Sequence, residues 1–282
     1  MPLNIIKKFI AILLININIF NLWEQVNILS KTTSRVLERK SIRPPKYQKP
    51  FFLIGLMNRG GDLENSFLKG QCDFFVFILM PILQDLRDIK SKVALEIGYG
   101  GGRLLFPATR IFKKVIGIDI HDNGQTVERE LKRRGANNFI LIKNNGKNIP
   151  LDNKSVDFVY SFIVLQHVES INIFNSYLKE TYRVLRKGGY AILFFGRLYS
   201  LSQGKSSKIL YWLDGLLEKI DPREYREIRA RVNCVNLKIS LDYAKKQANK
   251  LGFSLIKTGI SKKDPDLERY GGQYFILLKK QD

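Results

Sequence analysis

Five short apolar runs, separated by stretches with helical periodicity, constrain the fold of this 282-residue chain more than any other feature. The runs cover residues 93–97, 115–120, 139–142, 158–162 and 190–195, and the helical stretches cover 103–112, 125–134 and 171–185. Strands that are apolar throughout are typical of a parallel sheet with helices on both faces. A predicted helix at 241–250 and two more runs, 253–258 and 273–279, follow. The sequence therefore predicts an α/β fold, a doubly wound, mostly parallel sheet of seven strands with an antiparallel hairpin at its C-terminal edge.

The composition narrows the functional classes. Hydrophobic residues make up 45% of the chain, which indicates a globular protein rather than a disordered one. Cys72 and Cys234 form no metal-ligand spacing, and there are only two His, so we predict no disulfide framework and no metal site. The formal net charge of +21 favours anionic partners: nucleic acid, an acidic membrane surface or a phosphorylated substrate.

The first 50 residues differ from the rest. An apolar run at 9–15 follows two Lys, but Asn residues interrupt it, so it is a poor transmembrane span and lacks a signal-peptide cleavage site. A Pro-containing basic linker ends at Pro50. We therefore divide the chain into an arm, residues 1–50, and a main domain, residues 51–282. Packing of the arm on the domain and attachment to a membrane surface both stay open.

A glycine loop lies where the first strand of the main domain gives way to a helix. Gly98, Gly100 and Gly102 follow Glu96 at alternate positions. Glycines there allow a tight turn and close approach of a nucleotide-type ligand. A dinucleotide fingerprint would need glycine where Arg103 stands, and no phosphate-loop Lys is present. A buried acid at this strand end suits a ligand with an amine or another cationic group.

A second acid, Asp119, ends the second strand, about 20 residues beyond the glycine loop. An acid at this place can accept hydrogen bonds from both hydroxyls of a ribose. The two acids together predict a nucleoside ligand that also carries a positive charge. S-adenosylmethionine is such a ligand.

These residues, with three later segments, resemble a class I S-adenosylmethionine-dependent methyltransferase, most closely the broad group that includes the quinone-biosynthesis enzymes. The later segments are Asn145 to Pro150, Asp157 to His167 and Arg183 to Gly189. The resemblance implies a Rossmann-like sheet, S-adenosylmethionine as cofactor, and the following cofactor-binding residues: Glu96, Gly98, Gly100, Gly102, Asp119, Ile120, Asn145, Gly146 and Phe162. Asn145 stands where the family has Asp, and we expect its carbonyl oxygen to bind the adenine amine.

The acceptor is the least constrained part of the prediction. His167 is the candidate general base, and a purely structural role for it stays open. The inserted residues 196–239 carry an apolar helical stretch, and Asp221 followed by Pro222 predicts the start of a second helix, so we interpret the insertion as a helical cover over the acceptor. We expect O-methylation of a small molecule or a glycan or lipid intermediate. An RNA methyltransferase and a noncatalytic module that docks partners or membrane are the alternatives. The expected location is the cytoplasm, with peripheral membrane contact through the arm left open.

Overall fold

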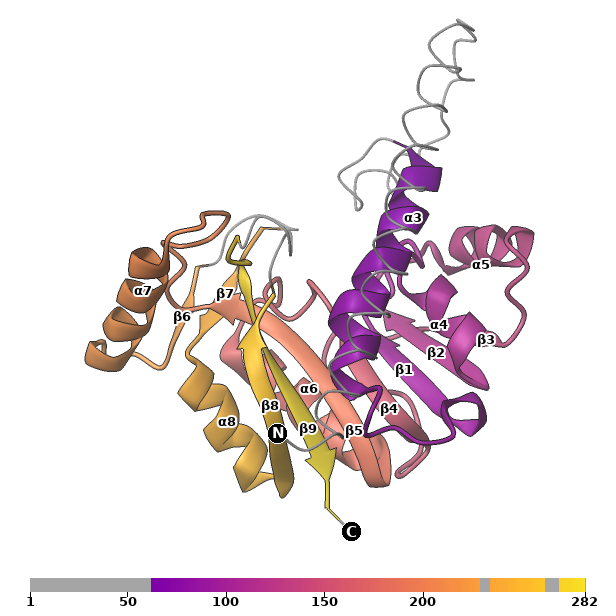
Figure 1. Ribbon diagram of the computed structural model, residues 1–282. Coiled ribbons are helices and arrows are strands. Elements are labelled where there is room, and N and C mark those ends of the chain that lie inside the picture. Colours follow the sequence, from indigo (N-terminus) through magenta and orange to yellow (C-terminus); the bar gives the residue numbers. More distant parts are fainter. Residues whose placement is uncertain (1–61, 229–233, 262–268, 282) are drawn as a thin grey trace, which may run out of the picture. The chain divides into compact units, whose positions relative to one another are not determined.

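The computed structural model describes residues 62–228, 234–261 and 269–281 (Figure 1). The chain divides into two compact units, Met1–Gln48 and Lys49–Asp282, and all described residues belong to the second. The arm predicted for residues 1–50 lies outside the described residues. Within the described ranges, no helix combines the length and apolarity needed to cross a bilayer.

A single mixed sheet forms the centre of this unit. Its strands are β1 (Val93–Ile97), β2 (Lys114–Asp119), β3 (Phe139–Lys143), β4 (Val156–Ser161), β5 (Leu185–Arg197), β6 (Tyr225–Glu227), β7 (Leu237–Ile239), β8 (Phe253–Ile260) and β9 (Gln273–Lys280). The order β3-β2-β1-β4-β5 is parallel, β9 runs antiparallel to β5, and β8 pairs antiparallel with β9. These seven strands are the predicted sheet with its antiparallel edge hairpin. The described residues hold nine strands because the short β6 and β7 extend the end of β5.

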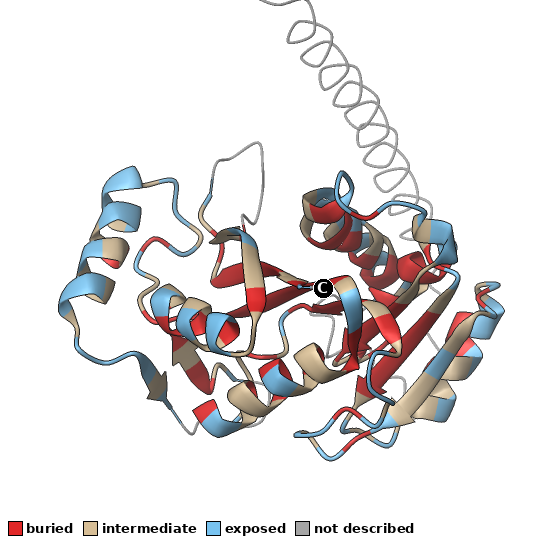
Figure 2. Ribbon diagram, turned by 90° about the horizontal axis from the view of Figure 1, so that it is seen from below, coloured by how far each residue is buried: buried red, intermediate tan, exposed pale blue. Residues whose placement is uncertain are grey.

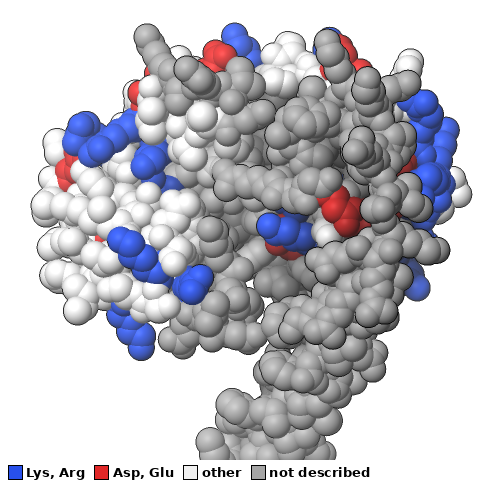
Figure 3. All heavy atoms as spheres, turned by 90° about the horizontal axis from the view of Figure 1, so that it is seen from above, with Lys and Arg blue, Asp and Glu red and all other residues white. Residues whose placement is uncertain are grey.

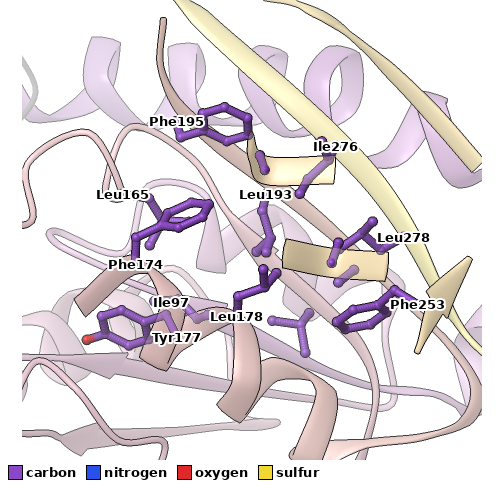
Figure 4. Close-up of a cluster of buried hydrophobic side chains, with 14 of the residues drawn as sticks. Ile97, Leu165, Phe174, Tyr177, Leu178, Leu193, Phe195, Phe253, Ile276 and Leu278 are labelled. Carbon is purple, nitrogen blue, oxygen red and sulfur yellow. The ribbon is translucent and has the colours of Figure 1, made fainter. Parts of the chain in front are cut away.

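Both faces of the sheet are covered, which explains why the strands are apolar throughout. One face carries α6 (Ile171–Val184) and α8 (Leu241–Lys250), with Phe174 and Leu178 packed towards Leu193 and Ile276 (Figure 4). The other carries α4 (Leu105–Ile111), α5 (Gly124–Arg133) and α3 (Leu63–Asp73). Successive strand residues point to opposite faces. In β1, Leu95 and Ile97 therefore belong to the α6 side, and Ala94 to the α3 side.

Helix α3 is an element that our sequence analysis did not predict. It continues through a π-helical stretch, Phe74–Leu79, into a short 3-10 turn, Met80–Ile82. Phe67 and Phe74 are fully buried on the sheet. A side chain at Gly70 would meet the backbone of Arg103, its Cβ 2.3 Å from that carbonyl oxygen, so α3 lies directly against the start of α4. The run of consecutive apolar residues at 74–80 hides the helical period, because almost every position is apolar.

The insertion at 196–239 is only partly helical. Helix α7 (Lys208–Ile220) contains the apolar stretch that the sequence placed in a helix. The second helix predicted from Asp221 onwards is wrong, because the chain there becomes β6 and pairs with β7. The Asp221 carboxylate does accept a hydrogen bond from Arg223 N, as a helix cap would, but it also binds the guanidinium of Arg226. Backbone pairing with β7 then supplies the partners that a helix would have supplied.

Candidate cofactor site

The glycine loop joins β1 to α4 with three residues in left-handed conformation. The φ angles of Gly98, Gly100 and Gly102 are +79°, +51° and +80°. The alternate spacing of the glycines therefore follows from the backbone path, since other residues rarely adopt such angles. A Cβ on Gly98 would also lie 2.3 Å from Cγ2 of Val164, in the turn after β4. Gly98 thus brings the glycine loop into contact with that turn.

Asp119 is held against the glycine loop at the end of β2. One carboxylate oxygen accepts a hydrogen bond from Gly100 N at 2.8 Å, and the other accepts from Ile120 N at 2.7 Å. A carboxylate has about four acceptor positions, so about two remain. The side chain keeps 11% of its surface exposed. These features fit the two hydroxyls of a ribose.

Ile120 and Gly146 lie opposite each other beside Asp119. Ile120 is 61% exposed, and its Cγ2 lies 3.3 Å from the point a Cβ on Gly146 would occupy. The exposed side chain of Ile120 and the backbone of Gly146 together form an apolar surface. Such a surface fits one side of a flat aromatic ring such as adenine. The expected role of Asn145 gains no such support. Its Oδ1 accepts from both Lys147 N (3.0 Å) and Asn148 N (2.9 Å), so its two lone pairs already hold the turn together.

Glu96 lies on the α3 face of the sheet and is only 2% exposed. Its one hydrogen bond in the described structure is accepted from the hydroxyl of Tyr160, at 3.1 Å. Burial, only partly offset by Tyr160 and by the charge of Arg103, raises the pKa of Glu96 to about 8. Arg103 itself is ion-paired with Asp73 of α3 at 2.5 Å. Glu96 is therefore a neutral acid at pH 7, and a cationic group brought next to it would favour its ionisation.

Phe162, at the end of β4, is mostly covered by protein. It is 8% exposed, and its ring stacks on Phe77 with 5.3 Å between centroids. Phe194 packs on it edge to face at 4.9 Å. Phe77 follows α3, so the N-terminal helical segment forms part of the wall around this site. Our sequence analysis did not single out Phe77 or Asp73, which contact Phe162 and Arg103.

His167 follows the turn after β4. Its Nδ1 lies 2.6 Å from the carbonyl oxygen of Cys234, and its Nε2 lies 3.3 Å from Nε2 of Gln166. The tautomer with hydrogen on Nδ1 satisfies both contacts, because Nδ1 then donates to Cys234 and Nε2 accepts from Gln166. His167 N also donates to Val164 O, which links the imidazole to the turn that touches Gly98.

His121 supports the glycine loop, a role the sequence did not reveal. Its Nε2 lies 2.9 Å from Gly100 O, and its Nδ1 accepts from Asn123 N at 3.1 Å. The ring of Tyr99 packs against it edge to face, with centroids 5.0 Å apart. His121 and Asp119 thus fix the carbonyl and the N–H of Gly100. The only sequence signal was its place two residues after Asp119.

Comparisons with known proteins agree with the fold. Residues 95–193 match the family model of the methyltransferase domain. A SAM-dependent methyltransferase from Methanosarcina mazei shares the fold, with a TM-score of 0.53, 18% identity, and coverage of 72% of this chain and 97% of that one. One from Mesorhizobium loti does so with a TM-score of 0.52, 12% identity, and coverage of 73% and 100%. The [4+2]-cyclase SpnF also shares it, with a TM-score of 0.52, 9% identity, and coverage of 77% and 82%. The search of curated protein sequences found no match.

The glycine loop, the acid ending β2 and the strand order define a class I, Rossmann-like methyltransferase domain. Residues 95–193 match such a methyltransferase domain, and the match together with the fold indicates S-adenosylmethionine as the cofactor. None of the matches singles out the quinone-biosynthesis group, so that part of the resemblance stays a prediction. Among the described residues, no cluster of His, Cys, Asp and Glu could hold a metal ion.

Proposed function

We propose that this methyltransferase methylates an oxygen atom of a small molecule or of a glycan or lipid intermediate. The observation that carries the proposal is the setting of His167. Its Nδ1 is engaged by the Cys234 carbonyl, so the lone pair of the neutral ring lies on Nε2. An imidazole nitrogen that can accept a proton, on the segment whose Val164 contacts Gly98, suits an acceptor hydroxyl, which needs a base more than an amine or a carboxylate does.

In this proposal the chain's own residues bind the cofactor and orient the acceptor. Asp119 would hold the ribose, Ile120 and Gly146 would line one side of the adenine, and Glu96 would face the positively charged end. When bound, S-adenosylmethionine supplies a methyl group already activated by a sulfonium. The protein then has mainly to bring the acceptor oxygen into line with that methyl group. His167 Nε2 would accept the hydroxyl proton, after Gln166 moves off that nitrogen, as the O–CH3 bond forms and the S–CH3 bond breaks to leave a neutral thioether.

RNA is the second candidate acceptor, because the chain carries a net charge of +21, and Lys and Arg gather at the right-hand edge of the face shown in Figure 3. Against it, Ser161 to Val164 stand where base-directed amino methyltransferases carry an Asn/Asp-Pro-Pro-aromatic motif. The noncatalytic alternative is the weakest, because the Asp119 contacts that suit a ribose are present.

The test uses the full-length chain and S-adenosylmethionine with a labelled methyl group, incubated separately with a lipid extract, a water-soluble metabolite fraction and total RNA. We expect base-stable label in lipid or metabolites, and much less label with Asp119→Ala at the same cofactor concentration. His167→Asn keeps a donor for the Cys234 carbonyl but removes the base, so kcat should fall about 10²-fold or more while cofactor affinity is unchanged. Label confined to RNA, or an unchanged kcat for His167→Asn, would contradict the proposal.

A further inference from the structure

Helix α7 turns its two acids towards the protein and carries an apolar stripe on its outer side. Ile209, Trp212 and Ile220 are 77%, 66% and 66% exposed, and Leu216 lies between them on the same face. Their spacing of three, four and four residues makes one continuous stripe along the helix. The only residue of α7 that is fully buried is an acid, Asp214. Figure 1 shows α7 at one end of the described unit, and Figure 2 colours this helix largely pale blue, as exposed.

The polar contacts of the inward side fix this orientation. Asp214 accepts hydrogen bonds from the buried guanidinium of Arg197, from the Ser202 hydroxyl at 2.6 Å and from Leu201 N at 2.6 Å. One turn later, Glu218 accepts from Leu241 N at 2.6 Å and from the Tyr274 hydroxyl at 2.9 Å. Turning the apolar stripe inward would break all of these contacts and leave buried polar groups unpaired. The stripe is therefore a fixed outer surface.

The charges around the stripe are positive. Lys208 and Lys219 lie next to it on the helix, both are exposed, and neither forms an ion pair with a described residue. The two acids of α7 are the inward-facing Asp214 and Glu218. An outward apolar face bordered by Lys, with Trp within it, matches the boundary between the headgroups and acyl chains of an anionic membrane.

We propose that α7 is a membrane-docking helix that binds an anionic lipid surface through Ile209, Trp212, Leu216 and Ile220. Charge complementarity favours this partner over a second copy of the chain, which would bring like charges together. Size favours it as well. A 13-residue helix is about 20 Å long, so one face offers far less than the roughly 800 Å² per partner of a stable protein interface. Docking is independent of methyl transfer and of the predicted contact through residues 1–50.

The direct test uses tryptophan fluorescence. The chain has two Trp, so Trp23→Phe in the full-length protein leaves Trp212 as the only reporter. With vesicles of phosphatidylcholine and phosphatidylglycerol, we expect Trp212 emission to shift to shorter wavelength and to be quenched by brominated acyl chains. Phosphatidylcholine alone or high salt should weaken the response. Cofactor binding, measured in parallel without vesicles, should be unchanged.

Matched variants give the second test. Trp212→Ser with Ile220→Ser should lower vesicle cosedimentation of the full-length chain at least about tenfold. Ile140→Ser with Ile256→Ser, at exposed apolar positions elsewhere, should leave it unchanged. Equal binding by the α7 variant would overturn the proposal. So would Trp212 emission that is already short in wavelength and protected from iodide without vesicles. Self-association that the α7 variant abolishes would also overturn it, because a second copy would then be the partner.

Discussion

Two buried carboxylates in this chain, Asp214 in the insertion and Glu96 beside the glycine loop, have almost the same exposure, 1% and 2%. Asp214 contacts the guanidinium of Arg197, two backbone N–H groups and the Ser202 hydroxyl. Glu96 has the Tyr160 hydroxyl and no cation in contact. Burial costs both groups their hydration, but only Asp214 has it replaced by protein partners.

This difference separates a structural acid from a binding one. The contacts of Asp214 leave little for a ligand to add, and they join α7 to the end of β5. Glu96 lacks a positive partner, and we expect the ammonium and the sulfonium of the cofactor to supply one. A buried group with too few partners next to a ligand site is a common mark of function. The following predictions test that contrast, from the largest expected effect to the smallest.

Asp214→Ala should lower the free energy of unfolding by about 4 kcal/mol, because it leaves the buried Arg197 guanidinium without its counterion. Chemical denaturation of the full-length protein measures this. Asp214→Ala combined with Arg197→Met should recover much of the loss, since both charges are then absent. A loss below about 1 kcal/mol for Asp214→Ala would mean that the ion pair does not hold the insertion in place.

Glu96→Gln should instead stabilise the cofactor-free protein, by about 2–3 kcal/mol at pH 8. The folded-state pKa, about 8, lies above the ordinary value of 4.5. Below pH 4.5 both states of the wild type bind the proton, and its full contribution to stability is present. As pH rises towards 8, the unfolded chain releases the proton first and wild-type stability falls. Denaturation at pH 5 and pH 8 should show the gain from Glu96→Gln growing with pH, and a gain independent of pH would contradict the assignment.

Asp119 has more protein partners than Glu96 and fewer than Asp214. It accepts from two backbone N–H groups, and part of its surface is exposed. Asp119→Ala should weaken S-adenosylmethionine binding by about 2 kcal/mol, or about thirtyfold, because a charged acceptor for the ribose is lost. Asp122→Ala is the matched control, since that carboxylate is 82% exposed nearby and should not affect binding. Titration calorimetry provides the measurement, and equal losses for the two variants would argue against a ribose contact.

The smallest effect concerns the charge state of Glu96 during binding. If the bound cation ionises Glu96, S-adenosylmethionine binding at pH 7 should release close to one proton, and affinity should rise from pH 6 to pH 8. Calorimetry in buffers of different ionisation enthalpy detects the proton. Glu96→Gln should abolish the release and weaken binding about tenfold. Binding without proton release in the wild type would place Glu96 away from the cation.

Much of the fold could be predicted because the local signals agree with the tertiary structure. β1 and α8 have the expected bounds, and Ser240 caps α8 by accepting from Tyr243 N. Local signals failed where tertiary contacts overrode them. The helical segment that continues α3, Phe74–Leu79, is apolar at every position and so shows no helical period. The residues after Asp221 became a strand because β7 was available to pair with them.

The sequence by itself determined the alternation of strands and helices, the glycine loop and the acid that ends β2. Each of these depends on residues close together in the chain, whose backbone preferences and burial period are local properties. Only the tertiary structure decided that α3 packs against Arg103, directly after the glycine loop. It also decided that the side-chain oxygen of Asn145 accepts hydrogen bonds from its own turn, and that α7 presents an apolar stripe outward. Periodicity gives a helix an apolar face but not the direction in which that face points. For α7, the direction follows from Arg197 and Tyr274, which lie 17 and 56 residues away from the acids they contact.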